Sequence, residues 1–448
     1  MATSSPVNID DALRKRLHAD ASANPEYWSF RFDAARRHAH AMFQYPAMMV
    51  PQMQARFIDD VCDVSRNVRS VYDPFVGSGT VLTETMLHGL DFFGQDVNPL
   101  AILLCRVKAG PFFTKSLANR AAGIRDHIKR DRCRRTEADF SGLSKWFRPD
   151  VARDLSKIVR AIRTERELWS RRFFWVCLAE AVRLTSNSRT STVKLHIRPK
   201  REINGRTLDA IELFHRLVAT NVSNLSSKYE LLEQKAHAAK GRYKGAVRTR
   251  LGDSASSEAD RCRFDLLITS PPYGDNVTTV TYGQHAYLPL QWIDRRDIDE
   301  DFDDALLGST HAIDSQSLGG SRKRALEVIP DLRERSAAFG KTINSLKREP
   351  RDRHLRVAAF VRDLDACLPS ILNRMRRNAY MIWVVGNRCV GGQEVPLRDI
   401  LLELLETRGA IHVETLDRRI PSKRMALHNG IAATMTNETV LVTRKDVA

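Results

Sequence analysis

The segment Val71-Tyr-Asp-Pro-Phe-Val-Gly-Ser-Gly-Thr80 carries the strongest structural signal in this 448-residue chain. Its apolar start predicts a buried strand that ends at Asp73-Pro74, and the glycines at 77 and 79 predict a tight turn into a helix. Glycine has no Cβ, so a cofactor can lie directly on the backbone of such a turn. The free N–H groups at the start of the following helix favour a carboxylate. We interpret the segment as the first strand–turn–helix unit of a nucleotide-binding sheet.

The next expected strand supports this interpretation, because it closes with Phe93-Gly-Gln-Asp-Val-Asn-Pro99. An acid at the end of the second strand is where parallel nucleotide-binding folds hold ribose hydroxyls. Asp96 follows the two glycines by 19 and 17 residues, close to the ~20 of a dinucleotide fingerprint. Leu82 stands where the third glycine of GxGxxG would be. The pattern therefore argues against NAD and favours another adenosine cofactor.

Seven short β-branched or aromatic runs predict buried strands. They cover residues 68–75, 91–97, 246–252, 264–269, 379–386, 410–415 and 438–443. Helical periodicity follows in between, over 81–89, 100–108, 355–377 and 397–408. This alternation predicts an α/β fold with a parallel, doubly wound sheet. Only a loop separates the last two strands, so we expect them to form a C-terminal antiparallel hairpin, because a parallel return needs a longer helical crossover.

Two largely helical or loop insertions interrupt the alternation, at 110–245 and 294–350. They divide the core into residues 1–109, 246–293 and 351–448. The first insert is basic: residues 120–172 hold 16 Lys and Arg against 8 Asp and Glu, and residues 183–206 hold 7 against 1. The second begins with the acidic cluster 297–304, which we expect to be an exposed loop because its spacing is not that of an EF-hand. Arg198-Pro-Lys-Arg201 and Arg322-Lys-Arg324 are candidate phosphate contacts.

The composition points to a polyanionic partner. Lys plus Arg number 71 and Asp plus Glu 54, for a net charge of +17, which favours nucleic acid over an anionic membrane. The N-terminal residues 1–11 lack an apolar signal region, and the most apolar run, 380–385, is too short to span a membrane. We therefore expect a cytoplasmic, nucleoid-associated bacterial protein without membrane insertion.

Metal and disulfide chemistry are not expected from the sequence. The seven cysteines are odd in number and none are paired as CxxC, which predicts buried, reduced thiols. His38-Ala-His40 has no Cys or carboxylate partner at metal-binding spacing, and we expect it on a basic helix surface.

The second chemical motif is Asp265-Leu-Leu-Ile-Thr-Ser-Pro-Pro-Tyr-Gly-Asp275. A buried strand ends directly in Ser270-Pro271-Pro272-Tyr273, the only Pro-Pro pair in the chain. Prolines fix φ and donate no hydrogen bond, so the backbone carbonyls become rigid acceptors. An aromatic ring beside them can stack on a planar base. Together these groups can hold an exocyclic amino group and clamp the ring that carries it.

These motifs, DPFVGSGT, GQDVNP and TSPPY in this order, resemble those of the S-adenosylmethionine (SAM)-dependent DNA amino-methyltransferases, which methylate the N4 of cytosine or the N6 of adenine. The resemblance covers about 250 residues. It implies a Rossmann-like seven-stranded SAM-methyltransferase sheet and SAM as cofactor. It also implies double-stranded DNA with a flipped target base as substrate and a cognate restriction endonuclease as a possible partner. The segment Arg419–Met425 resembles the closing segment of such enzymes.

The resemblance implies roles for particular residues. The base is held by Ser270, Pro271, Pro272 and Tyr273, and a serine in first place is commoner among N4-cytosine enzymes. The implied cofactor site comprises an N-terminal motif, the glycine turn and the ends of the second and third strands. These residues are Tyr45, Pro46, Ala47, Asp73, Pro74, Phe75, Gly77, Ser78, Gly79, Thr80, Asp96, Asn98 and Asp253.

Three alternatives stay open at this point. The target can be adenine N6 in DNA, or a guanine amine in structured RNA. The related RNA enzymes tend to carry Asp-Pro-Pro-Tyr and an RNA-binding domain before the cofactor motif, whereas only about 70 residues precede Asp73 here. The third alternative is a catalytically silent DNA-binding module, against which the intact Ser270–Tyr273 and Asp96 argue.

Overall fold

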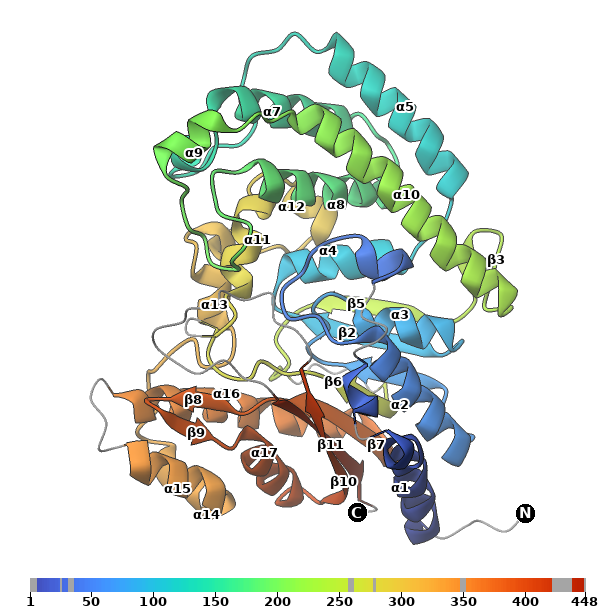
Figure 1. Cartoon of the computed structure of the whole chain (residues 1–448), viewed down its shortest axis with the longest axis vertical. Helices are drawn as coiled ribbons and strands as arrows, with labels where there is room; N and C mark the ends of the chain where they lie inside the picture. The colour runs from blue at the N-terminus through green and yellow to red at the C-terminus, as the bar shows by residue number, and fades with distance from the viewer. Residues whose placement is uncertain are drawn as a thin grey trace.

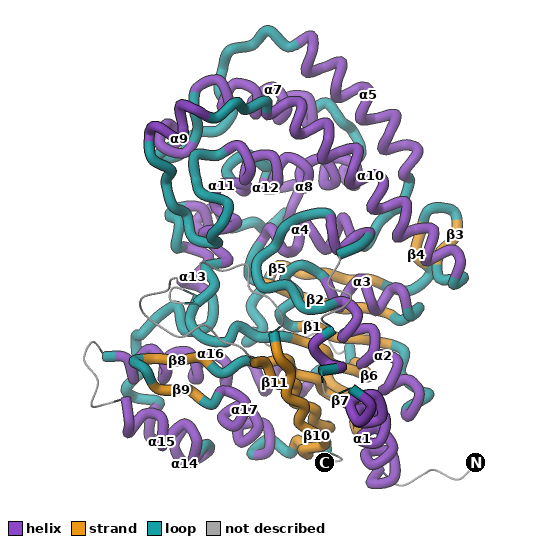
Figure 2. The backbone as a smooth tube through the Cα atoms, viewed as in Figure 1, coloured by secondary structure: helices purple, strands orange, loops and turns teal. Residues whose placement is uncertain are grey.

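The computed structural model describes residues 6–24, 26–30, 36–256, 262–276, 279–346, 352–420 and 437–446. A seven-stranded sheet in the order β10-β11-β7-β6-β1-β2-β5 forms the centre of the fold (Figures 1 and 2). The strands are β1 (Ser70–Asp73), β2 (Asp91–Asp96), β5 (Val247–Leu251), β6 (Phe264–Thr269), β7 (Met375–Val385), β10 (Ala410–Arg419) and β11 (Asn437–Lys445). All seven predicted strands are therefore present.

The sheet is parallel except at β11, which runs antiparallel to both of its neighbours, β7 and β10. The predicted C-terminal hairpin is thus confirmed. Its two strands are longer than expected, because β10 continues to Arg419 and β11 begins at Asn437.

The two faces of the sheet belong to two hydrophobic clusters, because successive strand residues point to opposite sides. Val71 and Leu266 lie in the first cluster, and their chain neighbours Tyr72 and Leu267 lie in the second. The first face is covered by α1 (Pro6–Ala23), α2 (Pro51–Val64), α3 (Thr80–Leu87) and α4 (Pro99–Lys108). The second face is covered by α14 (Ile329–Arg335), α15 (Ala337–Leu346), α16 (Arg353–Asn373) and α17 (Leu397–Glu406).

The basic segment 110–245 forms a helical layer that packs on α4, at the top of Figure 1. Its helices are α5 (Thr114–Arg130), α6 (Leu143–Trp146), α7 (Pro149–Arg163), α8 (Leu168–Thr185), α9 (Lys200–Gly205) and α10 (Ala210–Gln234). The short hairpin of β3 (Ala238–Ala239) and β4 (Arg242–Tyr243) follows and leads back into β5. Phe174 of α8 and Leu225 of α10 are buried in the same cluster as Leu100 of α4, so the helical layer shares its core with the sheet.

The segment 294–350 contributes to both sides of the molecule. It holds α12 (Arg295–Ile298), η3 (Asp304–Leu307), α13 (Ala312–Gln316), α14 and α15. The expectation of an exposed acidic loop is wrong at Asp297, which is only 8% exposed. Its carboxylate accepts hydrogen bonds from Arg171 and from the indole of Trp175, each at 2.7 Å. The basic helices supply partners that compensate the cost of burying the charge.

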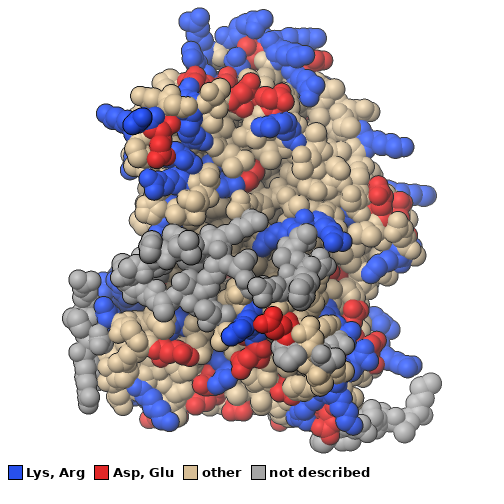
Figure 3. Space-filling view, in the orientation of Figure 1, with Lys and Arg blue, Asp and Glu red and all other residues tan. Residues whose placement is uncertain are grey.

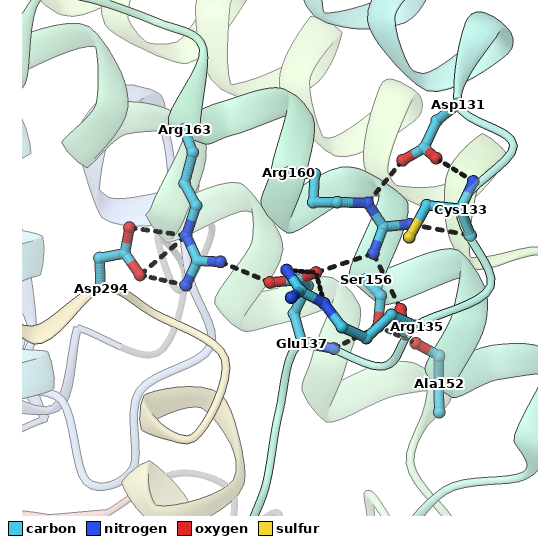
Figure 4. A network of polar contacts seen from close by, with 9 residues as sticks. All are labelled: Asp131, Cys133, Arg135, Glu137, Ala152, Ser156, Arg160, Arg163 and Asp294. Carbon is cyan, nitrogen blue, oxygen red and sulfur yellow. Dashed lines mark hydrogen bonds and ion pairs between the residues drawn. The ribbon is translucent and has the colours of Figure 1, made fainter.

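A polar network also joins the two inserts (Figure 4). Arg163 of α7 donates to Asp294 at 2.6 Å and to Glu137 at 2.7 Å. Arg160, one turn earlier, donates to the same Glu137 at 3.0 Å and to Asp131 at 2.7 Å. The network therefore ties the loop after α5 and the segment before α12 to one face of α7.

The remaining elements are short: η1 (Tyr27–Ser29), η2 (His38–Ala41), α11 (Tyr282–Leu290), β8 (Arg388–Val390) and β9 (Gln393–Val395). None of the described helices combines the length and the hydropathy that crossing a lipid bilayer requires. None of the seven cysteines, all of which lie in the described part of the chain, forms a disulfide. Three of them are buried, but Cys133 is exposed, contrary to the prediction of buried thiols.

Candidate active site

The glycine turn after β1 has the conformation that its sequence predicts. Gly77 and Gly79 have φ angles of +47° and +71°, in the left-handed region that residues with a Cβ rarely adopt. A Cβ on Gly79 would lie 2.9 Å from the sulfur of Cys105. The turn leads directly into α3, and the hydroxyl of Ser78 lies 3.1 Å from that of Thr80. The turn therefore has the tight form that its two glycines predict.

Asp96 holds this turn against the end of β2. Its Oδ2 accepts the N–H of Gly77 and its Oδ1 accepts the N–H of Asn98, both at 2.9 Å. Each carboxylate oxygen has a second lone pair, so the side chain can still accept ribose hydroxyls. Burial raises the pKa of Asp96 to about 6, although the backbone hydrogen bonds from Asn98 and Gly77 oppose the increase.

Asp73 is fully buried at the end of β1. Its Oδ1 accepts hydrogen bonds from the hydroxyl of Thr269 at 2.6 Å and from the N–H of Phe75 at 3.1 Å. Its Oδ2 is buried and has no hydrogen-bond partner among the described residues. Burial raises the pKa of Asp73 to about 7, with Thr269 and Phe75 opposing the increase. An unsatisfied carboxylate oxygen at this point fits the amino group of a SAM molecule laid on the turn.

Tyr45 and Tyr282 form an aromatic wall beside the turn. Asn98 donates its Nδ2 to the hydroxyl of Tyr45 at 3.0 Å, and a Cβ on Gly77 would lie 3.6 Å from the Tyr45 ring. The Tyr45 and Tyr282 rings stack with centroids 5.8 Å apart and planes at 26°. Pro46 is buried, and Ala47 has a φ of +45°. The predicted N-terminal motif therefore does lie next to the predicted cofactor turn.

Tyr282 has no counterpart in the sequence predictions, because no motif surrounds it. It begins α11, and Asp314 of α13 accepts the N–H of the next residue, Gly283, at 2.8 Å. Gly283 allows this approach, since a Cβ there would lie 2.8 Å from the backbone nitrogen of Asp314. The second insert thereby positions a ring of the site.

Asp253 lies two residues beyond Leu251, whose Cα pairs with that of Asp96. Its carboxylate is exposed and accepts the N–H of Ala255 at 2.9 Å. The neighbouring Ser254 is buried and donates its hydroxyl to the carbonyl oxygen of Pro74. In the structure it is thus Ser254 that contacts the cofactor turn, while Asp253 lies at the rim of the same sheet edge.

The Ser270–Tyr273 motif follows β6, the strand next to β1 in the sheet. Thr269, the last residue of β6, makes the 2.6 Å bond to Asp73, so the two predicted motifs start from adjacent, directly bonded strand ends. Ser270 donates its hydroxyl to that of Tyr273 at 3.2 Å. Gly274 follows, and a Cβ there would lie 2.0 Å from a guanidinium nitrogen of Arg388. Glycine is therefore required for Arg388 to pack behind the motif.

Two buried lysines lie beneath the glycine turn, and neither was expected from the sequence. Lys108 donates its Nζ to the carbonyl oxygen of Ser78 at 2.7 Å, and Lys228 of α10 donates to the carbonyl oxygen of Lys108 at 2.7 Å. Burial lowers the pKa of Lys108 to about 8 and that of Lys228 to about 7. Lys108 lies in the last turn of α4, where a lysine is usually exposed, and Lys228 lies inside α10. Local patterns therefore gave no signal for either burial. The helical insert thus supports the cofactor turn from below.

The His38-Ala-His40 segment is not the basic surface that we expected. His40 is 3% exposed, and its Nε2 lies 2.6 Å from a carboxylate oxygen of Glu84. Burial lowers the pKa of His40 and raises that of Glu84 to about 7. Among the described residues, no three His, Cys, Asp or Glu side chains are arranged to hold a metal ion. Of the predicted closing segment, residues 421–425 lie outside the described part of the chain.

The sheet order, the single antiparallel strand, the glycine turn and the acid that ends β2 define a Rossmann-like SAM-dependent methyltransferase fold. SAM is therefore the methyl donor. The chain is 29% identical over 443 residues to the type II methyltransferase M.MvaI of Kocuria varians, covering 97% of this chain and 95% of that protein. It is 30% identical over 89 residues to the type II methyltransferase M.MjaII of Methanocaldococcus jannaschii, covering 18% and 16% of the two chains.

No family model matches the sequence. The rRNA methyltransferase aviRa from Streptomyces viridochromogenes aligns with a TM-score of 0.32 at 11% identity, covering 92% of both chains.

Proposed function

We propose that this protein methylates the exocyclic N4 amine of a cytosine at a specific site in double-stranded DNA. The observation that carries the proposal is the 2.6 Å bond from Thr269 to Asp73. This bond joins the end of the strand before Ser270 to the end of the strand before the glycine turn. An amine held by the Ser270–Tyr273 motif therefore lies next to a methyl donor held by the glycine turn. The likeness to a type II methyltransferase over 97% of the chain supports DNA as the substrate.

The Ser270 hydroxyl and the neighbouring backbone carbonyl provide the hydrogen-bond acceptors that amine methylation needs. SAM supplies a methyl group bound to a positively charged sulfur. Ser270 Oγ and the Pro271 carbonyl accept the two N–H groups of the target amine, which draws its lone pair out of the ring and toward the methyl carbon. Rate acceleration then comes from holding nitrogen, carbon and sulfur in line. The C–N bond would form as the C–S bond breaks and leaves its electron pair on the sulfur, and the positively charged product amine would then release a proton to solvent.

The target base has to leave the duplex, because its amino group is otherwise paired and inaccessible. Tyr273 stacks on the flipped base, and stacking on an aromatic ring contributes about 1–3 kcal/mol per base. The ring is half-buried at the end of β6. A base clamped there has its exocyclic amine directed toward the cofactor turn.

The helical layer 110–245 is the proposed DNA-binding element. Lys and Arg gather over α5, α7 and α9 at the top of Figure 3, where they can neutralise phosphates. The loop between α8 and α9 is closed by a bridge between Ser188 and Ile197. The Leu195 N–H donates to Gln284 of α11 at 3.1 Å, so this loop reaches the helix that carries Tyr282.

That loop exposes both polar and apolar groups for base recognition. Ile197 is 43% exposed, which is unusual for a large apolar side chain in this protein. Lys200 and Arg201 follow on the exposed start of α9. Contacts between such cations and DNA phosphates position a protein on the duplex, whereas other side chains read the base edges in the grooves.

The identity of the methylated nucleoside shows which base is the target. Duplex DNA is methylated with the purified protein and SAM, digested to nucleosides and analysed by mass spectrometry. The proposal expects N4-methyldeoxycytidine. N6-methyldeoxyadenosine as the sole product would reassign the base while keeping the site. Methylation of RNA alone would overturn the DNA assignment. A cognate restriction endonuclease is a further proposal, tested by whether the methylated sequence resists cleavage by a nuclease that cuts the unmethylated one.

A further inference from the structure

Four side chains form a hydrogen-bonded row that begins with Ser270 and Tyr273 of the SPPY motif. Ser270 donates to the Tyr273 hydroxyl at 3.2 Å, and Tyr273 donates to Oε1 of Glu438 at 3.0 Å. Arg418 donates its Nη1 to Oε2 of Glu438 at 2.9 Å. The row leads from the end of β6 to the C-terminal hairpin.

The outer pair of this row is built into the hairpin. Arg418 of β10 and Glu438 of β11 are directly opposite each other in the strand register, a position in which opposite charges stabilise the pairing. Arg418 is only 5% exposed, and its guanidinium pairs with the carboxylate of Glu438 and fixes it in place. The ion pair therefore presents one carboxylate oxygen to Tyr273 from a rigid support.

The paired carboxylate determines the direction of every hydrogen bond in the row. A carboxylate can only accept, so the Tyr273 hydroxyl must donate its single hydrogen to Glu438. The Tyr273 oxygen is then an acceptor, and Ser270 donates its own single hydrogen to it. Ser270 Oγ has no hydrogen left for a bound base, and only its lone pair remains available.

We propose that Glu438 and Arg418 are positioning residues that make Ser270 an obligate acceptor, so that the site takes a base with an amino group and rejects the same ring with a carbonyl. The inference rests on the proposed function. Cytosine and uracil differ at this position, where cytosine has an N–H₂ donor and uracil a C=O acceptor. The Pro271 carbonyl is likewise an acceptor, so the oxygen of a uracil would face two acceptors and no donor.

A free serine hydroxyl would not discriminate in this way, because it can rotate to donate or to accept. A site whose buried polar groups are left unpaired rejects the wrong ligand strongly. The row therefore accounts for selection by hydrogen-bond polarity, in addition to ring shape. Adenine and hypoxanthine differ in the same way, by an amino group and a carbonyl, so the row would also discriminate between them if the target is a purine.

The test uses the full-length protein and duplexes of the mapped target site. Target cytosine or uracil is placed opposite an abasic position in each duplex, so that neither base is held by pairing and the cost of flipping is similar. We expect the wild type to bind the cytosine duplex about tenfold or more tightly, the scale set by one unmade buried hydrogen bond.

Glu438→Gln is the decisive variant, because an amide can present either a donor or an acceptor to Tyr273. We expect its cytosine preference to fall toward parity and its kcat to fall about tenfold, with unchanged affinity for SAM. Glu414→Gln is the matched control, since Glu414 lies on the same hairpin but contacts the exposed His18. That control should keep the wild-type preference and kcat.

A Glu438→Gln protein with wild-type preference and kcat would overturn the proposal. Should that variant fail to fold, Tyr273→Phe gives the same readout, because it releases the Ser270 hydrogen while keeping the ring. Loss of preference in Tyr273→Phe supports the row, and retained preference refutes it. Failure of the proposed function is distinct, because the wild type would then yield no methylated nucleoside from DNA.

Discussion

Cofactor binding is predicted to depend on the charge of Asp96, and Asp96→Asn tests this with little change in shape. The carboxylate already accepts the N–H groups of Gly77 and Asn98 at 2.9 Å, and each of its oxygens has a second lone pair that can accept a ribose hydroxyl. Hydrogen bonds to a charged group contribute about 1.5–3 kcal/mol. We therefore expect the substitution to weaken SAM binding by roughly 10–100-fold at pH 8.

The pH dependence of this difference gives the sharper test. Burial raises the pKa of Asp96 to about 6, so the carboxyl is ionised at pH 8 and about nine-tenths protonated one unit below its pKa, at pH 5. Protonated Asp96 must lose its proton before it binds as a carboxylate, which weakens wild-type binding about tenfold at pH 5. The amide does not titrate. Burial raises the pKa of Asp73 to about 7, and the charge of Asp96 is the smallest contribution to that increase, so the titration of Asp73 largely cancels in the ratio of the two proteins.

Calorimetry of SAM binding at pH 8, 7, 6 and 5 measures that ratio. The advantage of the wild type over Asp96→Asn should shrink about tenfold between pH 8 and pH 5. Asp91→Asn is the matched control, because Asp91 begins the same strand and accepts the N–H of Ala246 at 2.7 Å, at the opposite end from the cofactor turn. A ratio near one at pH 8, or a ratio independent of pH, would refute the assigned role of Asp96.

Three other predictions concern the base, the turn and the DNA. Tyr273→Ala should remove stacking of about 1–3 kcal/mol and sharply lower kcat at unchanged SAM affinity, and an unchanged kcat would exclude the clamp. Gly79→Ala should destabilise the fold by about 1–3 kcal/mol in urea unfolding, because its φ is +71° and a neighbouring sulfur lies 2.9 Å from the added Cβ. Gly123→Ala, in an open helix position, should instead stabilise by about 0.5–1 kcal/mol. Replacing Lys200 and Arg201 with Gln should flatten the log–log salt dependence of DNA binding by up to about 0.9 for each phosphate that is no longer neutralised, and an unchanged slope would remove α9 from the interface.

The sequence by itself determined the elements whose signals are local. Apolar runs of strand length, two glycines and a Pro-Pro pair are properties of neighbouring residues, so all seven strands, the turn at 77–79 and the motif at 270–273 could be predicted. The final hairpin followed from the absence of a helical pattern between its two strands. The acid at Asp96 was found because its distance from the turn reflects the length of one helix and one strand.

Only the tertiary structure decided which distant residues meet at these elements. The Tyr273–Glu438 bond joins residues 165 apart in the chain, and Lys228 reaches the carbonyl of a residue 120 positions away. Such contacts depend on the order of strands in the sheet and on the packing of the insert, and neither leaves a periodic pattern in the sequence. The burial of Asp297 and His40 was not predicted for the same reason. A polar side chain is expected at the surface unless a partner compensates its charge, and here the partners are distant in the chain. Local propensity specifies which strands and turns form, whereas the free energy of burying a charge depends on partners that the chain supplies only after it has folded.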